Sequence, residues 1–126
     1  MAGHSRKQRL FEYGELQTII SSKIRGVKRF SIHKFEVKET EDFRPVILRG
    51  GSIHIDGTLF DLDWESIMAL DEYRKDFCRE MVLLNDGWAW SWFPRSGKGY
   101  TTQRWIQMGK LWTWNGIQEI KLASDS

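Results

Sequence analysis

The chain has 126 residues, 40% of them hydrophobic and 29% charged, and these values are typical of one globular domain. A single cysteine, Cys78, excludes an internal disulfide and a zinc site built from several cysteines. The chain has neither a run of about 18 apolar residues, as a membrane span needs, nor the apolar segment of a secretory signal. We therefore expect an intracellular protein, cytoplasmic or nuclear, that is not secreted and has no membrane partner.

Charge is distributed unevenly along the chain, although the net charge is only +2. Residues 1–38 contain nine Lys or Arg and three Glu, residues 39–86 contain five against twelve Asp or Glu, and residues 87–126 contain five against two. The basic ends favour an anionic partner. A mixed surface with a disordered basic N-terminus over residues 1–9 explains them as well. Residues 10–126 are predicted to form the single domain.

Residues 10–24 fit a helix and a strand about equally. Spacings of three and four between Tyr13, Leu16, Ile20 and Ile24 favour a helix. Gly14 weakens that prediction, and a strand over residues 17–21 is the alternative.

Residues 27–62 are predicted to form an antiparallel meander of four short strands. Gly50-Gly51 and Asp56-Gly57 have the composition of tight turns between strands. The phase of the apolar residues shifts near His33, which indicates a bulge.

One helix is predicted over residues 63–83, where apolar residues recur at helical spacing from Trp64 to Met81. Asp63 is the expected N-cap, and Glu65 lies in the first turn, where its charge suits the helix dipole. Gly87 is available to end the helix.

Six of the seven tryptophans lie beyond residue 86. Trp88, Trp90 and Trp92 alternate, so they share one face of a strand and are expected to pack against the helix. A two-residue turn at Gly109-Lys110 places Trp105 opposite Trp114, and Asn115-Gly116 is typical of a second hairpin. The predicted fold is α+β: an antiparallel meander, one central helix, and a second, Trp-rich antiparallel meander.

The sequence contains no recognisable catalytic motif. Ser96-Gly97-Lys98-Gly99 lacks the spacing of a phosphate-binding loop, and the three histidines lack metal-ligand spacing. Cys78, placed mid-helix, is expected to be an inert buried thiol. We predict no enzymatic activity, no catalytic residues, no metal and no cofactor.

Cations and aromatic residues alternate on several predicted strands. Proteins that bind single-stranded nucleic acid combine a basic groove with aromatic rings on which bases stack. The residues predicted to contact nucleic acid are Lys28, Arg29, Arg49, Arg95, Lys98, Tyr100, Arg104 and Trp105, with any exposed member of Trp88–Trp92 as a further stacking ring.

The pattern over residues 27–77 resembles the positive-cofactor-4 type of transcriptional coactivator and, more loosely, the plant Whirly proteins. The matching stretches are Val27–Ile32, Val46–Arg49 and Gly57–Ile67. The resemblance implies four strands followed by a helix, dimerisation, and binding of single-stranded DNA. It adds Trp64, and also Phe60, to the expected contacts.

The leading hypothesis is a homo-oligomer that binds single-stranded DNA or RNA. The alternative is a structural or adaptor protein, such as a viral accessory factor, with a Trp-rich interface for a protein partner. A carbohydrate-binding module is a third interpretation of the alternating tryptophans. Solvent exposure of the tryptophans beside Arg95, Lys98 and Arg104 would favour nucleic acid.

Overall fold

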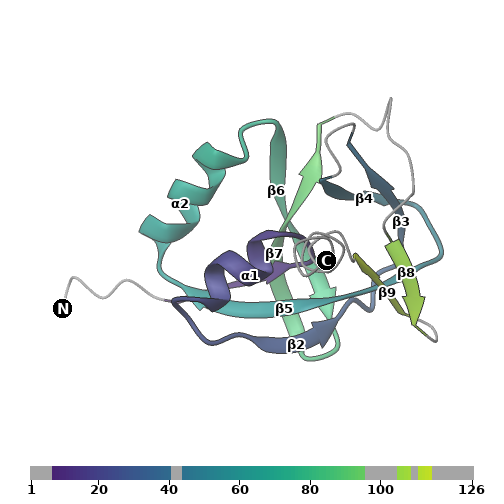
Figure 1. Cartoon of the computed structure of the whole chain (residues 1–126), viewed down its shortest axis with the longest axis horizontal. Helices are drawn as coiled ribbons and strands as arrows, with labels where there is room; N and C mark the ends of the chain where they lie inside the picture. Colours follow the sequence, from purple (N-terminus) through teal and green to yellow (C-terminus); the bar gives the residue numbers. More distant parts are fainter. Residues whose placement is uncertain (1–6, 41–43, 96–104, 109–110, 115–126) are drawn as a thin grey trace, which may run out of the picture.

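A computed structural model describes residues 7–40, 44–95, 105–108 and 111–114 (Figure 1). The described elements, in chain order, are β1 (Gln8–Glu12), α1 (Leu16–Ser21), β2 (Val27–Phe30), β3 (Phe35–Glu39), β4 (Pro45–Arg49), β5 (His54–Leu62), α2 (Trp64–Tyr73), β6 (Phe77–Leu84), β7 (Gly87–Pro94), β8 (Trp105–Met108) and β9 (Leu111–Trp114). The predicted α+β class is confirmed. Within these residues neither helix has the length or the apolar composition to cross a membrane.

The main sheet has seven strands and curls on itself. Its order is β6-β7-β1-β5-β9-β8, and β2 pairs with β5. After β2, Ser31 bridges to Leu84, and the amide of Ile32 donates to the carbonyl of Leu83 at the end of β6. Strands β6, β7, β1, β5 and β2 therefore form a ring, while β3 and β4 form a separate two-stranded sheet.

The curled sheet has apolar side chains on both faces. Along β1, Phe11 and Tyr13 point into the cluster that β3 and β4 also line, whereas Leu10 points to the opposite face, against the helices. Leu16 and Ile20 of α1 and Ile67 of α2 complete the helix-side cluster. Because β1 is covered on both faces, its sequence shows no clear alternation of polar and apolar residues.

The chain from residue 8 to residue 24 contains both elements that the sequence left open. A strand begins at Gln8, inside the segment expected to be disordered, and it pairs with β5 and β7. Helix α1 follows at Leu16. The strand was missed because the pairing of Gln8 with Leu62, and of Leu10 with Trp90, joins distant parts of the chain.

The helix predicted over residues 63–83 is correct only in its first half. Asp63 caps α2 by accepting a hydrogen bond from the Ser66 amide, and Glu65 lies in the first turn, as predicted. The helix ends at Tyr73, and β6 forms an eight-residue hairpin with β7 that turns at Asn85-Asp86. Tertiary pairing overrides the helical spacing of the apolar residues there. Cys78 is consequently on a strand and half-buried.

The strands of residues 27–62 do not form the predicted meander, since β2 pairs with β5 and β3 pairs with β4. Asp56-Gly57 is not a turn either, because both residues lie inside β5. A Cβ on Gly57 would lie 2.6 Å from the Glu12 carbonyl oxygen and 2.8 Å from the Phe11 ring. Glycine at position 57 therefore permits close packing of β5 on β1.

The tryptophans of β7 share one face, but the helices cover only part of it. Trp92 is buried and Trp90 is half-buried in the helix-side cluster, whereas Trp88 is 52% exposed. In the β8–β9 hairpin Trp105 pairs with Trp114, so the predicted register is confirmed. The turn at residues 109–110 and the predicted hairpin at residues 115–116 lie outside the described residues.

Candidate functional site

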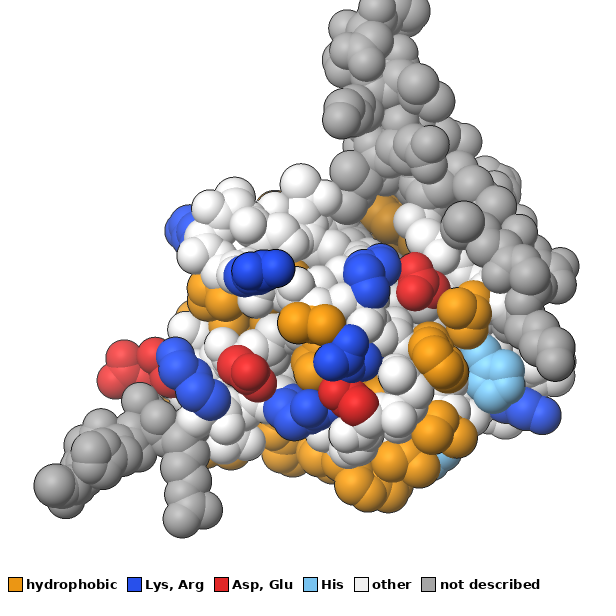
Figure 2. All heavy atoms as spheres, turned by 90° about the horizontal axis from the view of Figure 1, so that it is seen from below, with side chains coloured by type: hydrophobic (Ala, Val, Ile, Leu, Met, Phe, Trp, Pro, Cys, Tyr) orange, Lys and Arg blue, Asp and Glu red, His pale blue; other side chains and the backbone are white. Residues whose placement is uncertain are grey.

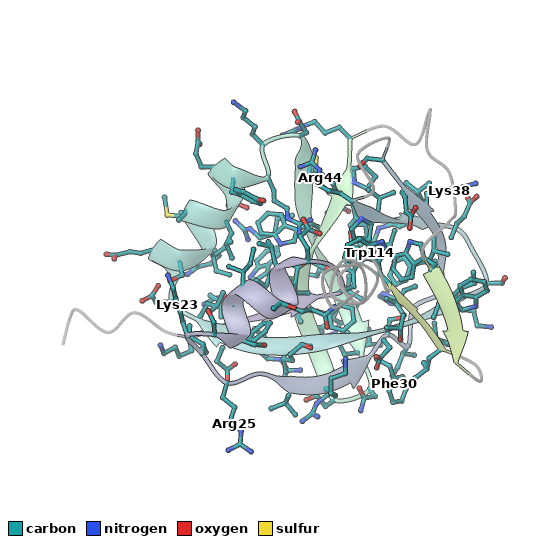
Figure 3. The ribbon with its side chains drawn as sticks, in the orientation of Figure 1. Lys23, Arg25, Phe30, Lys38, Arg44 and Trp114 are labelled. Carbon is teal, nitrogen blue, oxygen red and sulfur yellow. The ribbon has the colours of Figure 1, made fainter. Side chains whose placement is uncertain are left out.

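Predicted contacts Lys28 and Arg29 lie on β2, at the bottom of the molecule in Figure 1. Exposed cations and exposed apolar side chains are mixed there, as Figure 2 shows from below. We define this surface, the β2 face, by Arg9, Arg25, Val27, Lys28, Arg29, Phe30, Ile32 and Trp88. Phe30 is 39% exposed, and Arg25 projects below β2 into solvent (Figure 3).

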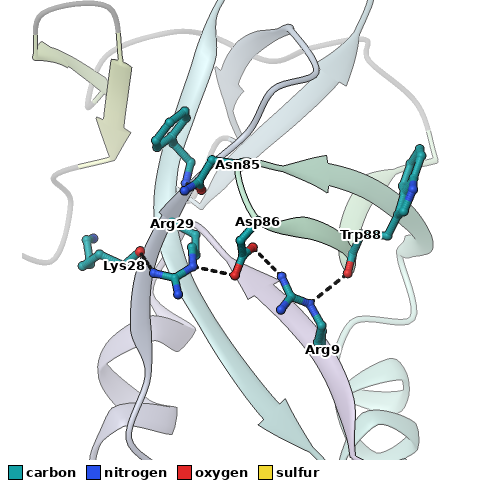
Figure 4. Close-up of polar contacts among 7 residues, drawn as sticks. Arg9, Lys28, Arg29, Asn85, Asp86 and Trp88 are labelled. Carbon is teal, nitrogen blue, oxygen red and sulfur yellow. Dashed lines mark hydrogen bonds and ion pairs between the residues drawn. The ribbon is translucent and has the colours of Figure 1, made fainter.

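The β6–β7 turn holds the β2 face together (Figure 4). Asp86 pairs with Arg9 from β1 and with Arg29 from β2, the latter at 2.7 Å. These two arginines hold the pKa of Asp86 below its ordinary value, mainly through the hydrogen bond from Arg9. Arg9 also donates to the carbonyl of Trp88 at 3.0 Å. The bridge thus fixes two cations beside an exposed aromatic ring.

Asn85 closes the free edge of β2. Its side-chain oxygen accepts from the Phe30 amide, and its own amide donates to the Phe30 carbonyl. The guanidinium of Arg29 donates to the carbonyl of Lys28. With these backbone groups occupied, the β2 face offers side chains to a ligand, not a strand edge for β-sheet extension.

The β2 face is more basic than the number of its ion pairs suggests. Arg9 and Arg29 share the single carboxylate of Asp86, and Lys28 pairs with Asp56 at 3.1 Å while remaining 63% exposed. No ion pair of Arg25 is found among the described residues. Four cations therefore accompany two carboxylates on a surface that also exposes Phe30 and Trp88.

The other predicted contacts do not join the β2 face. Arg49 donates to Glu80 and to the carbonyl of Met81, with its guanidinium 4.5 Å from the Phe93 ring. Arg95 follows β7 and donates to the carbonyl of Lys75. Seven strand residues separate Arg95 from Trp88, which is a distance of about 23 Å along an extended strand.

Trp105 is buried, with its indole N–H bonded to the carbonyl of Lys38, so its ring is not open to a base. Phe60 is also fully buried. The predicted contacts Lys98, Tyr100 and Arg104 lie outside the described residues.

Trp64 contributes to a different aromatic cluster, on the outer side of β6 and β7. It is 38% exposed, and its ring centroid is 6.1 Å from that of Trp90. The guanidinium of Arg79 lies 5.1 Å from the Trp64 ring and 4.4 Å from the Trp90 ring. Asp71 holds the same guanidinium through two side-chain oxygens, so this cation is engaged by its own neighbours.

The sequence gave no warning of a buried ionic cluster on the helix side of β1. Glu12 is fully buried and accepts from Arg74 at 3.0 Å, and Glu15 lies 3.5 Å from the same guanidinium. Burial raises the pKa of Glu12, and the attraction of Arg74 opposes this effect. Burial also raises the pKa of Tyr13, whose hydroxyl donates to the carbonyl of Trp92.

The ionic cluster joins the ends of the two helices. Glu15 is the N-cap of α1, and Arg74 is the C-cap of α2 and contacts the Phe77 ring. One carboxylate oxygen of Glu12 and the Nε of Arg74 have no hydrogen-bond partner. A perturbed buried carboxyl group can indicate a functional site, but an ion pair that supports the fold produces the same shift. The cluster connects three elements of the fold, and we interpret it as structural.

Within the described ranges, no group of three or more His, Cys, Asp or Glu side chains is arranged to hold a metal ion.

Comparison with known proteins found no matching family model and no matching curated protein. Solved structures do share the fold. An uncharacterised protein from Pyrococcus horikoshii matches with a TM-score of 0.62 and 16% identity, over 94% of this chain and 96% of that one. A protein from Arabidopsis thaliana, solved in solution, matches with a TM-score of 0.63 and 13% identity, over 99% and 89% of the two chains.

A third structure, allophanate hydrolase from Kluyveromyces lactis, matches 79% of this chain but only 19% of its own, with a TM-score of 0.56 and 14% identity. At these identities the likeness extends to the fold alone.

Proposed function

We propose that this chain binds single-stranded nucleic acid, DNA or RNA, through the β2 face. The observation that carries the proposal is the coincidence of unbalanced positive charge with two exposed aromatic rings on one surface. Phosphates are attracted by the cations, and every base offers a ring face for stacking, so such a surface binds strands of many sequences.

Each part of the β2 face has a role in this proposal. Arg25 and Lys28, whose side chains extend into solvent, contact phosphates. Arg29 is held in place by Asp86 and contributes a fixed cation. Phe30 and Trp88 stack with bases, because both rings are more than a third exposed.

The test is fluorescence anisotropy of labelled oligo(dT) and oligo(U) titrated with the full chain over a range of salt concentrations. The logarithm of the association constant is expected to fall linearly with the logarithm of salt concentration. Arg25→Glu should weaken binding and make the slope shallower by about 0.7, the value for one lost phosphate contact on a single strand. Lys75→Glu, an equal charge change at an exposed site after α2, is the matched control.

Stacking is tested separately from charge. Trp88→Ala should cost about 1–3 kcal/mol of binding free energy and leave the salt slope unchanged. Met68→Ala, at an exposed apolar residue of α2, should have no effect. Absence of binding at micromolar protein and low salt, or equal losses in Arg25→Glu and Lys75→Glu, would contradict the proposal.

A further inference from the structure

Helices α1 and α2 form an apolar groove of about 380 Å³ on the side of the sheet away from β2 (Figure 1). We define the α1–α2 groove by its lining, which is Leu16, Ile19, Ile20, Lys23, Ile24, Leu62, Ser66, Ala69, Leu70 and Tyr73. Large apolar side chains along it are open to solvent: Ile19 is 54% exposed, Tyr73 is 58% exposed, and Met68 beside it is 64% exposed. Apolar surface gathered in this way is typical of an interface.

Helix α2 is poorly covered by the rest of the chain. Of its ten residues only Ile67 is buried. Apolar residues at positions 64, 68, 69 and 73 are exposed on more than one side of the helix. A surface helix normally confines its apolar residues to the stripe that faces the core. The sequence of α2 is therefore suited to a helix that is covered from outside as well.

The two helices run antiparallel, which fixes the charges at the ends of the groove. The ion pair between Glu15 and Arg74 joins the N-terminus of α1 to the C-terminus of α2. Lys23, just beyond α1, is thereby at the opposite end, beside the start of α2 (Figure 3). Glu72 is one helical turn beyond Ala69, so it lies beside the groove at the Arg74 end. The groove has a cation at one end and a carboxylate at the other.

This charge pattern complements itself under a two-fold rotation. An axis through the middle of the groove brings Lys23 of one copy against Glu72 of the other, and the same contact occurs a second time. Apolar residues of both copies meet between these two contacts. We propose that the α1–α2 groove is the surface through which two copies of this chain form a symmetric dimer. The inference does not depend on nucleic-acid binding, which uses the β2 face.

Sedimentation equilibrium of the full chain tests the dimer. The wild-type chain is expected to dimerise, and Met68→Asp should raise the dimer dissociation constant by on the order of a hundredfold, because each dimer would bury two unpaired carboxylates. Ile19→Asp should act in the same way. Ile32→Asp, at a residue 47% exposed beyond β2, is the matched control and should dimerise like the wild type. Circular dichroism confirms that each variant is folded.

A charge exchange tests the symmetry. Lys23→Glu or Glu72→Lys alone should weaken the dimer by on the order of tenfold, since each places two like-charge contacts in the interface. The double variant Lys23→Glu/Glu72→Lys should restore wild-type affinity. A wild-type chain that stays monomeric, a folded Met68→Asp variant that dimerises normally, or a double variant no tighter than the single ones would overturn the proposal. These results do not bear on oligonucleotide binding, which is measured separately.

Discussion

Replacing Arg74 by methionine is expected to be among the most destabilising single changes in this chain that leave packing volume nearly intact. Arg74 is 4% exposed and is the ion-pair partner of Glu12, which is fully buried. Removing one partner of a buried pair costs about 3–5 kcal/mol, because the remaining charge keeps its desolvation penalty and loses its compensation. The methionine side chain retains most of the contact with Phe77, so lost packing adds little.

A double-mutant cycle assigns the cost to the charge. Glu12→Leu alone leaves Arg74 with Glu15 at 3.5 Å, so it should cost less than Arg74→Met. The double variant Glu12→Leu/Arg74→Met carries no unpaired charge at either position. It should be more stable than the sum of the single effects predicts by about 2–3 kcal/mol.

Urea unfolding followed by tryptophan fluorescence measures these free energies. Lys28→Met is the control, since Lys28 pairs with Asp56 while 63% exposed, and it should change stability by less than about 1 kcal/mol. An Arg74→Met variant that unfolds at the wild-type urea concentration would show that the cluster is hydrated in solution. Additive single effects would show that Glu12 and Arg74 do not stabilise each other.

Two further predictions concern Glu12 and its neighbour Gly57. Burial raises the folded-state pKa of Glu12 above its ordinary 4.5, so its contribution to stability is complete below pH 4.5 and is lost as pH rises through the folded-state pKa. Unfolding at a series of pH values should therefore show Glu12→Gln gaining on the wild type as pH rises, and parallel curves would contradict this. Gly57→Ala should cost about 1–3 kcal/mol in urea unfolding, because its Cβ meets the Glu12 carbonyl and the Phe11 ring. Gly50→Ala, where a Cβ meets nothing within 4 Å, separates this clash from the cost of a positive φ.

Features set by neighbouring residues were predicted well from the sequence. Asp63 caps a helix because its side chain reaches an amide three residues away, and that spacing is visible in the sequence. The pairing of Trp105 with Trp114 follows from the length of one turn. The charge and aromatic character of Lys28, Arg29 and Phe30 could also be read from one stretch of chain.

Features set by distant residues were missed. Nothing between Tyr73 and Phe77 is a glycine or proline that would end a helix, so the change to β6 depends on pairing with β7. Glu12 and Arg74 are 62 positions apart, and each looks like an ordinary surface charge in its own segment. Arg49 and Arg95 were grouped with Arg29 by composition, yet each folds onto a different strand partner.

The two proposed surfaces lie on opposite sides of the main sheet, and this arrangement links their effects. A dimer formed through the α1–α2 groove leaves the β2 face of each subunit free. A long strand that reaches both β2 faces is then bound twice, and the second contact is intramolecular, so its affinity exceeds that of a short strand. Met68→Asp, which separates the subunits, should remove this advantage of length and leave the binding of a short oligonucleotide unchanged. Anisotropy with short and long oligo(dT) measures both, and an undiminished length advantage in a monomeric Met68→Asp variant would show that one β2 face alone accounts for it.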